Sequence, residues 1–155
     1  MLVESLKVLK SNMPHIAEKV HLLLFGGIRN ESLLEEIPVS YTYLGKIDSA
    51  KVKEVYSHAD VVLSSSHYET LPGTLIEGLA SGCVAVTYGN GGQADIVEHM
   101  ATGYIAQYKS AEDFARGIEW AANVDISRDS LHAEMEKRFS AASVVSRYLN
   151  YLRSL

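Results

Sequence analysis

The sequence is poor in cysteine and proline and has no long apolar run, and each shortage excludes a class of protein. Cys83 is the one cysteine among 155 residues, so a scaffold held by internal disulfides is excluded. Three prolines and 11 glycines are too few for a collagen-like or low-complexity chain. No stretch approaches the roughly 20 apolar residues of a membrane span, and Glu4 and Lys7 interrupt the start, where a signal peptide would be apolar. We therefore expect a cytoplasmic protein.

Positive charge is also scarce. The chain has 14 Lys and Arg against 19 Asp and Glu, a formal net charge of -5. Because nucleic-acid-binding domains are usually basic, we expect no nucleic-acid partner, and any anionic ligand must be held by local groups. The six histidines show no metal-ligand spacing and no Asp-x-Asp pair occurs, so no metal ion is expected.

Helix-like and strand-like segments alternate along the chain. Helices are predicted over residues 1–13, 49–58 (with Ser49 as N-cap), 74–81, 111–122, 127–139 and 140–155. Strands are predicted over 20–25, 41–45, 60–64, 83–87 and, at an edge, 103–106. The run 20–25 is apolar enough to be buried on both faces, and Cys83 is expected in the core. The alternation predicts one Rossmann-like, doubly wound α/β domain over residues 1–155, a parallel sheet with helices on both faces and no strand ahead of the first helix.

Ligands of such a domain bind beyond the carboxyl ends of the strands. This places the candidate site in the loops 26–29, 45–48, 64–73 and 88–93. The third loop turns into a helix near Pro72, and a helix start offers free N–H groups and a positive dipole end, which suit phosphate. Gly73 removes a side chain where a ligand could approach the backbone.

Two carboxylates, Glu69 and Glu77, bracket this helix start, and each has a structural explanation beside the functional one. Thr74-x-x-Glu77 matches a capping box, and Glu69 could be a solvated loop carboxylate, as His67 beside it could be a solvated histidine. A retaining glycosidase needs its two carboxylates about 5 Å apart, whereas eight helical steps span about 12 Å. We therefore expect the pair to contact different parts of one extended ligand.

Several motifs follow one another in a fixed order. Glu69-x7-Glu77 is followed by Gly78-Leu79-Ala80-Ser81-Gly82-Cys83-Val84-Ala85-Val86 and then by Gly91-Gly92-Gln93-Ala94-Asp95-Ile96-Val97. Earlier in the chain come Leu24-Phe25-Gly26-Gly27, Leu44-Gly45 and Val55-Tyr56-Ser57-His58-Ala59-Asp60-Val61. This ordered set resembles the donor-binding half of the retaining glycosyltransferases called group 1 (family 4 type), which have the two-domain GT-B architecture. The resemblance covers essentially the whole chain.

The resemblance implies a role for each site residue. Glu69 would be the catalytic-site carboxylate that contacts the donor-sugar hydroxyls, and Glu77 would bind the ribose. The sugar and diphosphate would be held by the backbone of Leu71, Pro72, Gly73 and Thr74. The base and nucleotide would lie against Gly26, Gly27, Gly45, Lys46 and Ile47.

Three features depart from the family pattern. Thr70-Leu71 replaces an aromatic-Gly pair after the first Glu, and Ala94-Asp95 replaces Pro-Glu after the second glycine loop. The family's diphosphate-binding Arg and Lys precede a helix that begins like residues 1–6, so Lys46 and Arg29 are the basic candidates here.

The resemblance implies transfer of a sugar from a UDP- or GDP-linked donor to a saccharide or lipid-linked saccharide acceptor, as in polysaccharide biosynthesis, without a cofactor. The partner would be an N-terminal acceptor-binding domain, through which any peripheral membrane contact would be made. In such enzymes the last helix crosses to that domain, so we expect exposed apolar residues there. The alternative is a nucleotide-binding module with no activity of its own. A sugar-nucleotide epimerase is disfavoured because Glu-x7-Glu is typical of the transferases.

Overall fold

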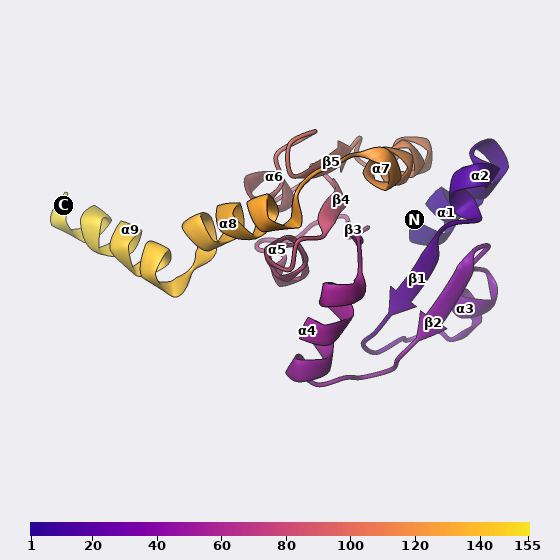
Figure 1. The fold of residues 1–155 in the computed structure, drawn as a ribbon, viewed down its shortest axis with the longest axis horizontal. Coiled ribbons are helices and arrows are strands. Elements are labelled where there is room, and N and C mark those ends of the chain that lie inside the picture. Colours follow the sequence, from indigo (N-terminus) through magenta and orange to yellow (C-terminus); the bar gives the residue numbers. More distant parts are fainter.

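The computed structural model describes all 155 residues and contains nine helices and five strands (Figure 1). The helices are α1 (Leu2–Asn12), α2 (Pro14–Ala17), α3 (Ser32–Glu35), α4 (Ser49–His58), α5 (Gly73–Ala80), α6 (Gln93–Ile96), α7 (Ala111–Asn123), α8 (Arg128–Phe139) and α9 (Ala141–Arg153). The strands are β1 (His21–Leu24), β2 (Ser40–Tyr43), β3 (Val61–Ser64), β4 (Val84–Tyr88) and β5 (Gly103–Ala106). The predicted alternation of helices and strands is confirmed.

All strand pairs are parallel, but they form two sheets and not the single one we expected. One sheet is β1-β2 and the other is β3-β4-β5, with β5 at an edge as predicted. The hydrogen-bonded pairing stops between β1 and β3, because no strand of these 155 residues lies hydrogen-bonded between them.

The core lies on the β3-β4-β5 sheet. All five residues of β4 are buried, and α5 and α7 pack against it. Phe114 and Ile118 of α7 are buried, and Trp120 stacks at a tilt on Tyr104, with ring centroids 5.9 Å apart. Cys83 is fully buried, as expected. These residues pack the helices onto the strands and leave the carboxyl-end loops at the surface.

Two local predictions are wrong. Strand β1 is not buried on both faces, because its sheet has two strands only; His21 is exposed and its ring hydrogen-bonds to Ser40 and Thr42. The N-cap of α4 is Asp48 and not Ser49. Asp48 has the extended backbone of a cap, and its carboxylate accepts the Lys51 N–H at 2.8 Å, whereas Ser49 is already helical.

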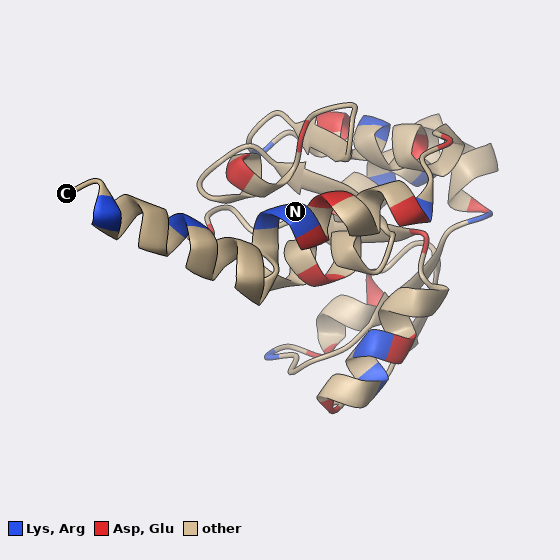
Figure 2. Ribbon diagram, turned by 60° about the vertical axis from the view of Figure 1, so that its left-hand side comes forward, with Lys and Arg blue, Asp and Glu red and all other residues tan.

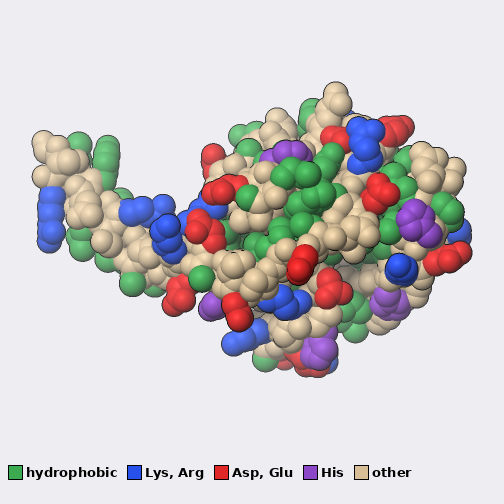
Figure 3. Space-filling model, turned by 45° about the horizontal axis from the view of Figure 1, so that its top comes forward, with side chains coloured by type: hydrophobic (Ala, Val, Ile, Leu, Met, Phe, Trp, Pro, Cys, Tyr) green, Lys and Arg blue, Asp and Glu red, His purple; other side chains and the backbone are tan.

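The last helix, α9, projects from the body of the molecule and has no buried residue (Figure 1). Its apolar side chains are exposed, as expected for the last helix: Val144, Val145, Tyr148, Leu149, Tyr151 and Leu152. Figure 3 shows this arm as a narrow projection with hydrophobic side chains at its surface. Its only charges are Arg147 and Arg153, whereas acidic residues are spread over the body (Figure 2). None of the helices combines the length and hydropathy that crossing a bilayer requires.

Candidate functional site

The loops after β1 and β2 contact each other directly. Gly26 N donates to Gly45 O at 2.8 Å, and the Tyr43 hydroxyl donates to Gly26 O at 2.8 Å. Both glycines have positive φ, 103° and 65°, a region that other residues rarely adopt. The Lys46 side chain lies over Gly27, since a Cβ there would stand 3.7 Å from Lys46 Cε. The predicted nucleotide-binding loops thus form one unit.

Helix α5 starts at the surface with free backbone donors. Its N-cap, Pro72, is buried, and the first two helical residues, Gly73 and Thr74, are exposed. Their N–H groups have no hydrogen-bond acceptor within the chain, as is general for the first turn of a helix. The predicted capping box is wrong, because Pro72 holds the cap position and Thr74 is inside the helix. The carboxylate of Glu77 is therefore not used by the helix.

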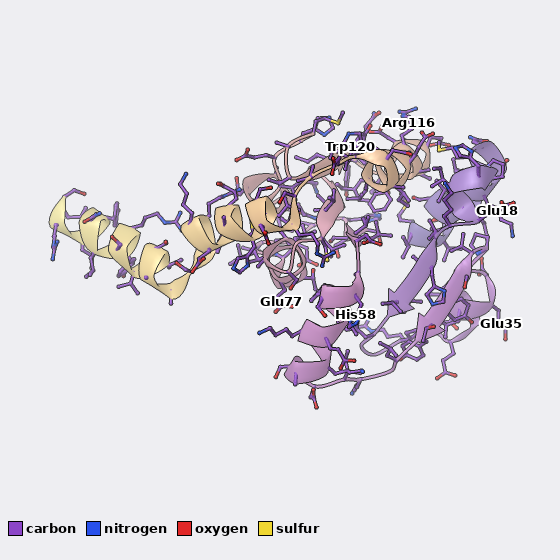
Figure 4. All side chains as sticks on the ribbon, in the orientation of Figure 1. Glu18, Glu35, His58, Glu77, Arg116 and Trp120 are labelled. Carbon is purple, nitrogen blue, oxygen red and sulfur yellow. The ribbon has the colours of Figure 1, made fainter.

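Glu77 lies exposed on α5 and forms no ion pair or hydrogen bond (Figure 4). The charge of Glu77 acts on Tyr56 of α4. Burial, and after it the Glu77 charge, raises the pKa of the Tyr56 phenol to about 12. The Tyr56 ring in turn meets Phe25 edge-on, with centroids 5.9 Å apart. Phe25 directly precedes Gly26-Gly27, and α4 also contacts α5, so α4 connects α5 to the loop after β1.

Glu69 lies in the loop after β3, half-buried, against the second glycine loop. Its carbonyl accepts the Gly92 N–H at 2.7 Å, and it forms an isolated parallel bridge with Gly91. Its carboxylate has no partner in the chain, and Leu71, two residues on, is 63% exposed. His67, the histidine candidate, packs edge-on against Tyr108, with centroids 5.8 Å apart.

No basic side chain forms an ion pair or hydrogen bond with residues 69–77, and the loop 64–73 contains neither Lys nor Arg. Arg29 is exposed and makes no ion pair. An anion bound at the start of α5 would therefore contact backbone N–H groups and not a basic side chain of this loop. No three His, Cys, Asp or Glu side chains are grouped so that they could hold a metal ion.

The candidate site lies at the surface, since Gly73, Thr74 and Glu77 are exposed and Glu69 is half-buried. Two hollows, of about 290 and 210 Å³, lie elsewhere: the first between α1, α2 and the start of β2, the second between β1 and α4. Neither is lined by Glu69 or Glu77.

The sequence placed Asn90 and Gln93 in the candidate loop 88–93 and Tyr56 in the motif 55–61, but it gave none of the three a role in the site. Asn90 and Gln93 flank the Gly91-Gly92 pair, and the signal that could have found them is polar side chains on both sides of a glycine turn after a buried strand.

Comparison with known proteins gives consistent matches. A family model described as glycosyl transferases group 1 matches residues 1–138. The chain is 32% identical over 143 residues to the 2-deoxystreptamine N-acetyl-D-glucosaminyltransferase of Niallia circulans, covering 86% of this chain and 36% of that protein. It is similar in fold to Anabaena HepE in complex with UDP-glucose, with a TM-score of 0.73 and 18% identity, covering 98% of this chain and 44% of that one. The chain thus spans roughly a third of the length of the curated relative.

Proposed function

Because the chain belongs to the group 1 glycosyl transferases, we propose that it is the donor-binding half of a retaining GT-B glycosyltransferase. The enzyme would move a sugar from a UDP- or GDP-linked donor to a saccharide or lipid-linked saccharide acceptor. The observation that carries the proposal is the start of α5, where the N–H groups of Gly73 and Thr74 have no partner. In the chain these two residues lie between Glu69 and Glu77, whose carboxylates are also free.

Each group then has a task that its chemistry suits. The N–H groups and the positive end of α5 bind the diphosphate and stabilise the charge that develops as the sugar leaves. The Glu77 carboxylate accepts hydrogen bonds from the two ribose hydroxyls, and Glu69 accepts them from the sugar. The acceptor hydroxyl oxygen bonds to the anomeric carbon on the face that the diphosphate leaves, as the bond between that carbon and the diphosphate oxygen breaks. The departing diphosphate takes the hydroxyl proton, and the anomeric configuration is retained. No metal takes part, and Lys46 and Arg29 supply the positive charge of the nucleotide loops.

The base of the nucleotide lies against the paired loops after β1 and β2, beside Gly26, Gly27, Gly45 and Ile47. The contact between Phe25 and Tyr56 of α4 supports this placement, because α4 packs against the helix that carries Glu77. Nucleotide and sugar would therefore extend across both sheets.

We propose an acceptor-binding domain of the same enzyme as the partner. Three observations support it: the greater length of the relatives, the surface position of the site, and the exposed apolar side of α9. Ligand sites commonly lie between domains, so this domain would close the site. Any membrane contact would belong to it, and the single buried cysteine suits a reducing, cytoplasmic location.

The second candidate function is a nucleotide-binding module with no activity alone, which the same surface site supports. Incubating the chain with UDP-glucose and a saccharide distinguishes the two functions. Sugar transfer or donor hydrolysis would exclude the inactive module, and we expect neither from this chain by itself.

Calorimetry with UDP and GDP tests the donor-binding proposal. We expect one nucleotide to bind and Glu77→Gln to weaken it by about 10-fold, the loss of one or two hydrogen bonds to a charged group. Glu35→Gln on α3 is the matched control, since it removes the same charge from another exposed helix position (Figure 4). If the parent chain binds neither nucleotide, or if Glu77→Gln binds as the parent does, the proposal is wrong.

A further inference from the structure

The loop that carries Glu69 is fastened to the loop after β4 by three hydrogen bonds, all donated from the later loop. They are Asn90 Nδ2 to His67 O at 2.8 Å, Gly92 N to Glu69 O at 2.7 Å, and Gln93 Nε2 to Ser66 O at 3.2 Å. The acceptors are consecutive or nearly consecutive carbonyls, so the bonds fix the course of the main chain directly ahead of the Glu69 side chain.

The glycine pair of the later loop allows this contact. A Cβ at Gly92 would stand 1.9 Å from Thr70 O, and one at Gly91 would stand 2.6 Å from Glu69 O. Gly91 also has a φ of 89°, which favours glycine. Both glycines are therefore explained by the approach of one loop to the other.

Gln93 is the unusual member of this contact. It is fully buried, and its Oε1 has no hydrogen-bond partner. Burying an amide with an unpaired oxygen costs stability, whereas methionine would fill a similar volume without that cost. Part of this cost is offset by Nε2, which donates its one hydrogen bond to Ser66 O. A buried amide whose one hydrogen bond goes to the loop that carries Glu69 is explained better by holding that loop than by packing alone.

We propose that Gln93 is a positioning residue that, with Asn90, holds residues 66–69 so that Glu69 faces the donor sugar. The inference rests on the proposed function and names a determinant of its specificity. The Glu77 and base contacts come from α5 and from the loops after β1 and β2, which these hydrogen bonds do not touch. Loss of the bonds therefore weakens recognition of the sugar and spares that of the nucleotide.

The test compares binding of UDP and of UDP-glucose to the whole chain by calorimetry. For Gln93→Met and, separately, Asn90→Ala, we expect UDP-glucose affinity to fall about fivefold and UDP affinity to change less than about twofold, in line with one lost hydrogen bond. Glu77→Gln is the contrasting control, because it weakens both ligands alike. Asn90 is only half-buried, so its variant keeps the test open if Gln93→Met folds poorly.

A double-mutant cycle shows whether Gln93 acts through Glu69. If it does, Gln93→Met adds little to the loss of UDP-glucose affinity already caused by Glu69→Gln. Equal weakening of UDP and UDP-glucose by both loop variants, or additive losses in the cycle, would overturn the positioning role. If the parent binds UDP but no variant changes the ratio of the two affinities, only this inference fails. If the parent binds neither ligand, the proposed function fails first.

Discussion

The ring of Tyr56 meets the ring of Phe25 edge-on, at an interplanar angle of 86°, and this contact joins the two parts of the candidate site. Phe25 precedes the first glycine loop, and Tyr56 lies where the charge of Glu77 reaches its phenol. The two parts belong to sheets that share no hydrogen-bonded strand pair. The pair is therefore one of the packing contacts through which the buried core continues from one sheet to the other.

Tyr56→Ala is expected to destabilise the chain by about 3–5 kcal/mol, because it removes a buried ring and its aromatic partner contact. Tyr56→Phe keeps both and is expected to be nearly neutral. Urea unfolding followed by far-UV circular dichroism measures the difference. Equal stability of the alanine variant and the parent would show that the pair does not hold the two parts together.

Tyr56 also makes stability depend on alkaline pH. Burial and the Glu77 charge raise the pKa of its phenol from 10 to about 12. The neutral phenol is thus favoured in the folded state, and its contribution is complete below pH 10 and is lost as pH rises toward 12. Between these two pH values, the stability of Tyr56→Phe is expected to fall less steeply than that of the parent chain. Identical alkaline unfolding curves for variant and parent would contradict the assignment.

Cys83 is expected to be unreactive while the chain is folded. Burial raises the pKa of its thiol to about 11, and its Sγ lies 3.3 Å from the carbonyls of Tyr56 and Ala59. Since the thiolate is the reactive form, a thiol reagent at neutral pH should label the protein only in concentrated urea. Rapid labelling without denaturant would mean that this part of the core opens readily.

Asp113 is expected to support the fold at neutral pH and not in acid. Its carboxylate is partly buried, which raises its pKa, but hydrogen bonds from Gln107 N, Tyr104 OH and Arg116 outweigh burial and hold the pKa below its usual 3.8. The stabilisation is present above that value and is lost as pH falls through the lower, folded-state pKa. Asp113→Asn should cost about 1–2 kcal/mol at neutral pH and little in acid. Asp125→Asn, at an exposed position, is the control in urea unfolding at both pH values.

Two glycines should respond to alanine in opposite ways. A Cβ at Gly73 would meet nothing within 4 Å, so Gly73→Ala should leave stability unchanged or raise it by about 0.5 kcal/mol, yet reduce UDP-glucose binding by crowding the start of α5. Gly92→Ala would clash with Thr70 O and should cost about 1–3 kcal/mol. Thermal unfolding and calorimetry separate the effects. If Gly73→Ala binds UDP-glucose as tightly as the parent chain does, the diphosphate does not lie against Gly73.

The strands and long helices could be predicted within a residue or two, because apolar periodicity depends on burial of a face and little else. The loops of the site could be predicted as well, since parallel strands bring their carboxyl ends to one edge. The caps could not. Asp48 and Ser49 are both good capping residues, and Pro72 displaced the expected Thr74–Glu77 box, because the choice depends on where the backbone becomes helical.

The sequence alone determined the fold class, the burial of Cys83 and the positions of Glu69 and Glu77 around a helix start, because all of these follow from local composition and chain order. Only the tertiary structure decided that β1 and β3 belong to separate sheets, that Tyr56 of α4 packs on Phe25, and that Gln93 is buried against the Glu69 loop. These contacts join residues that are distant in the chain. Their geometry is set by how whole elements pack, which no local pattern of residues encodes.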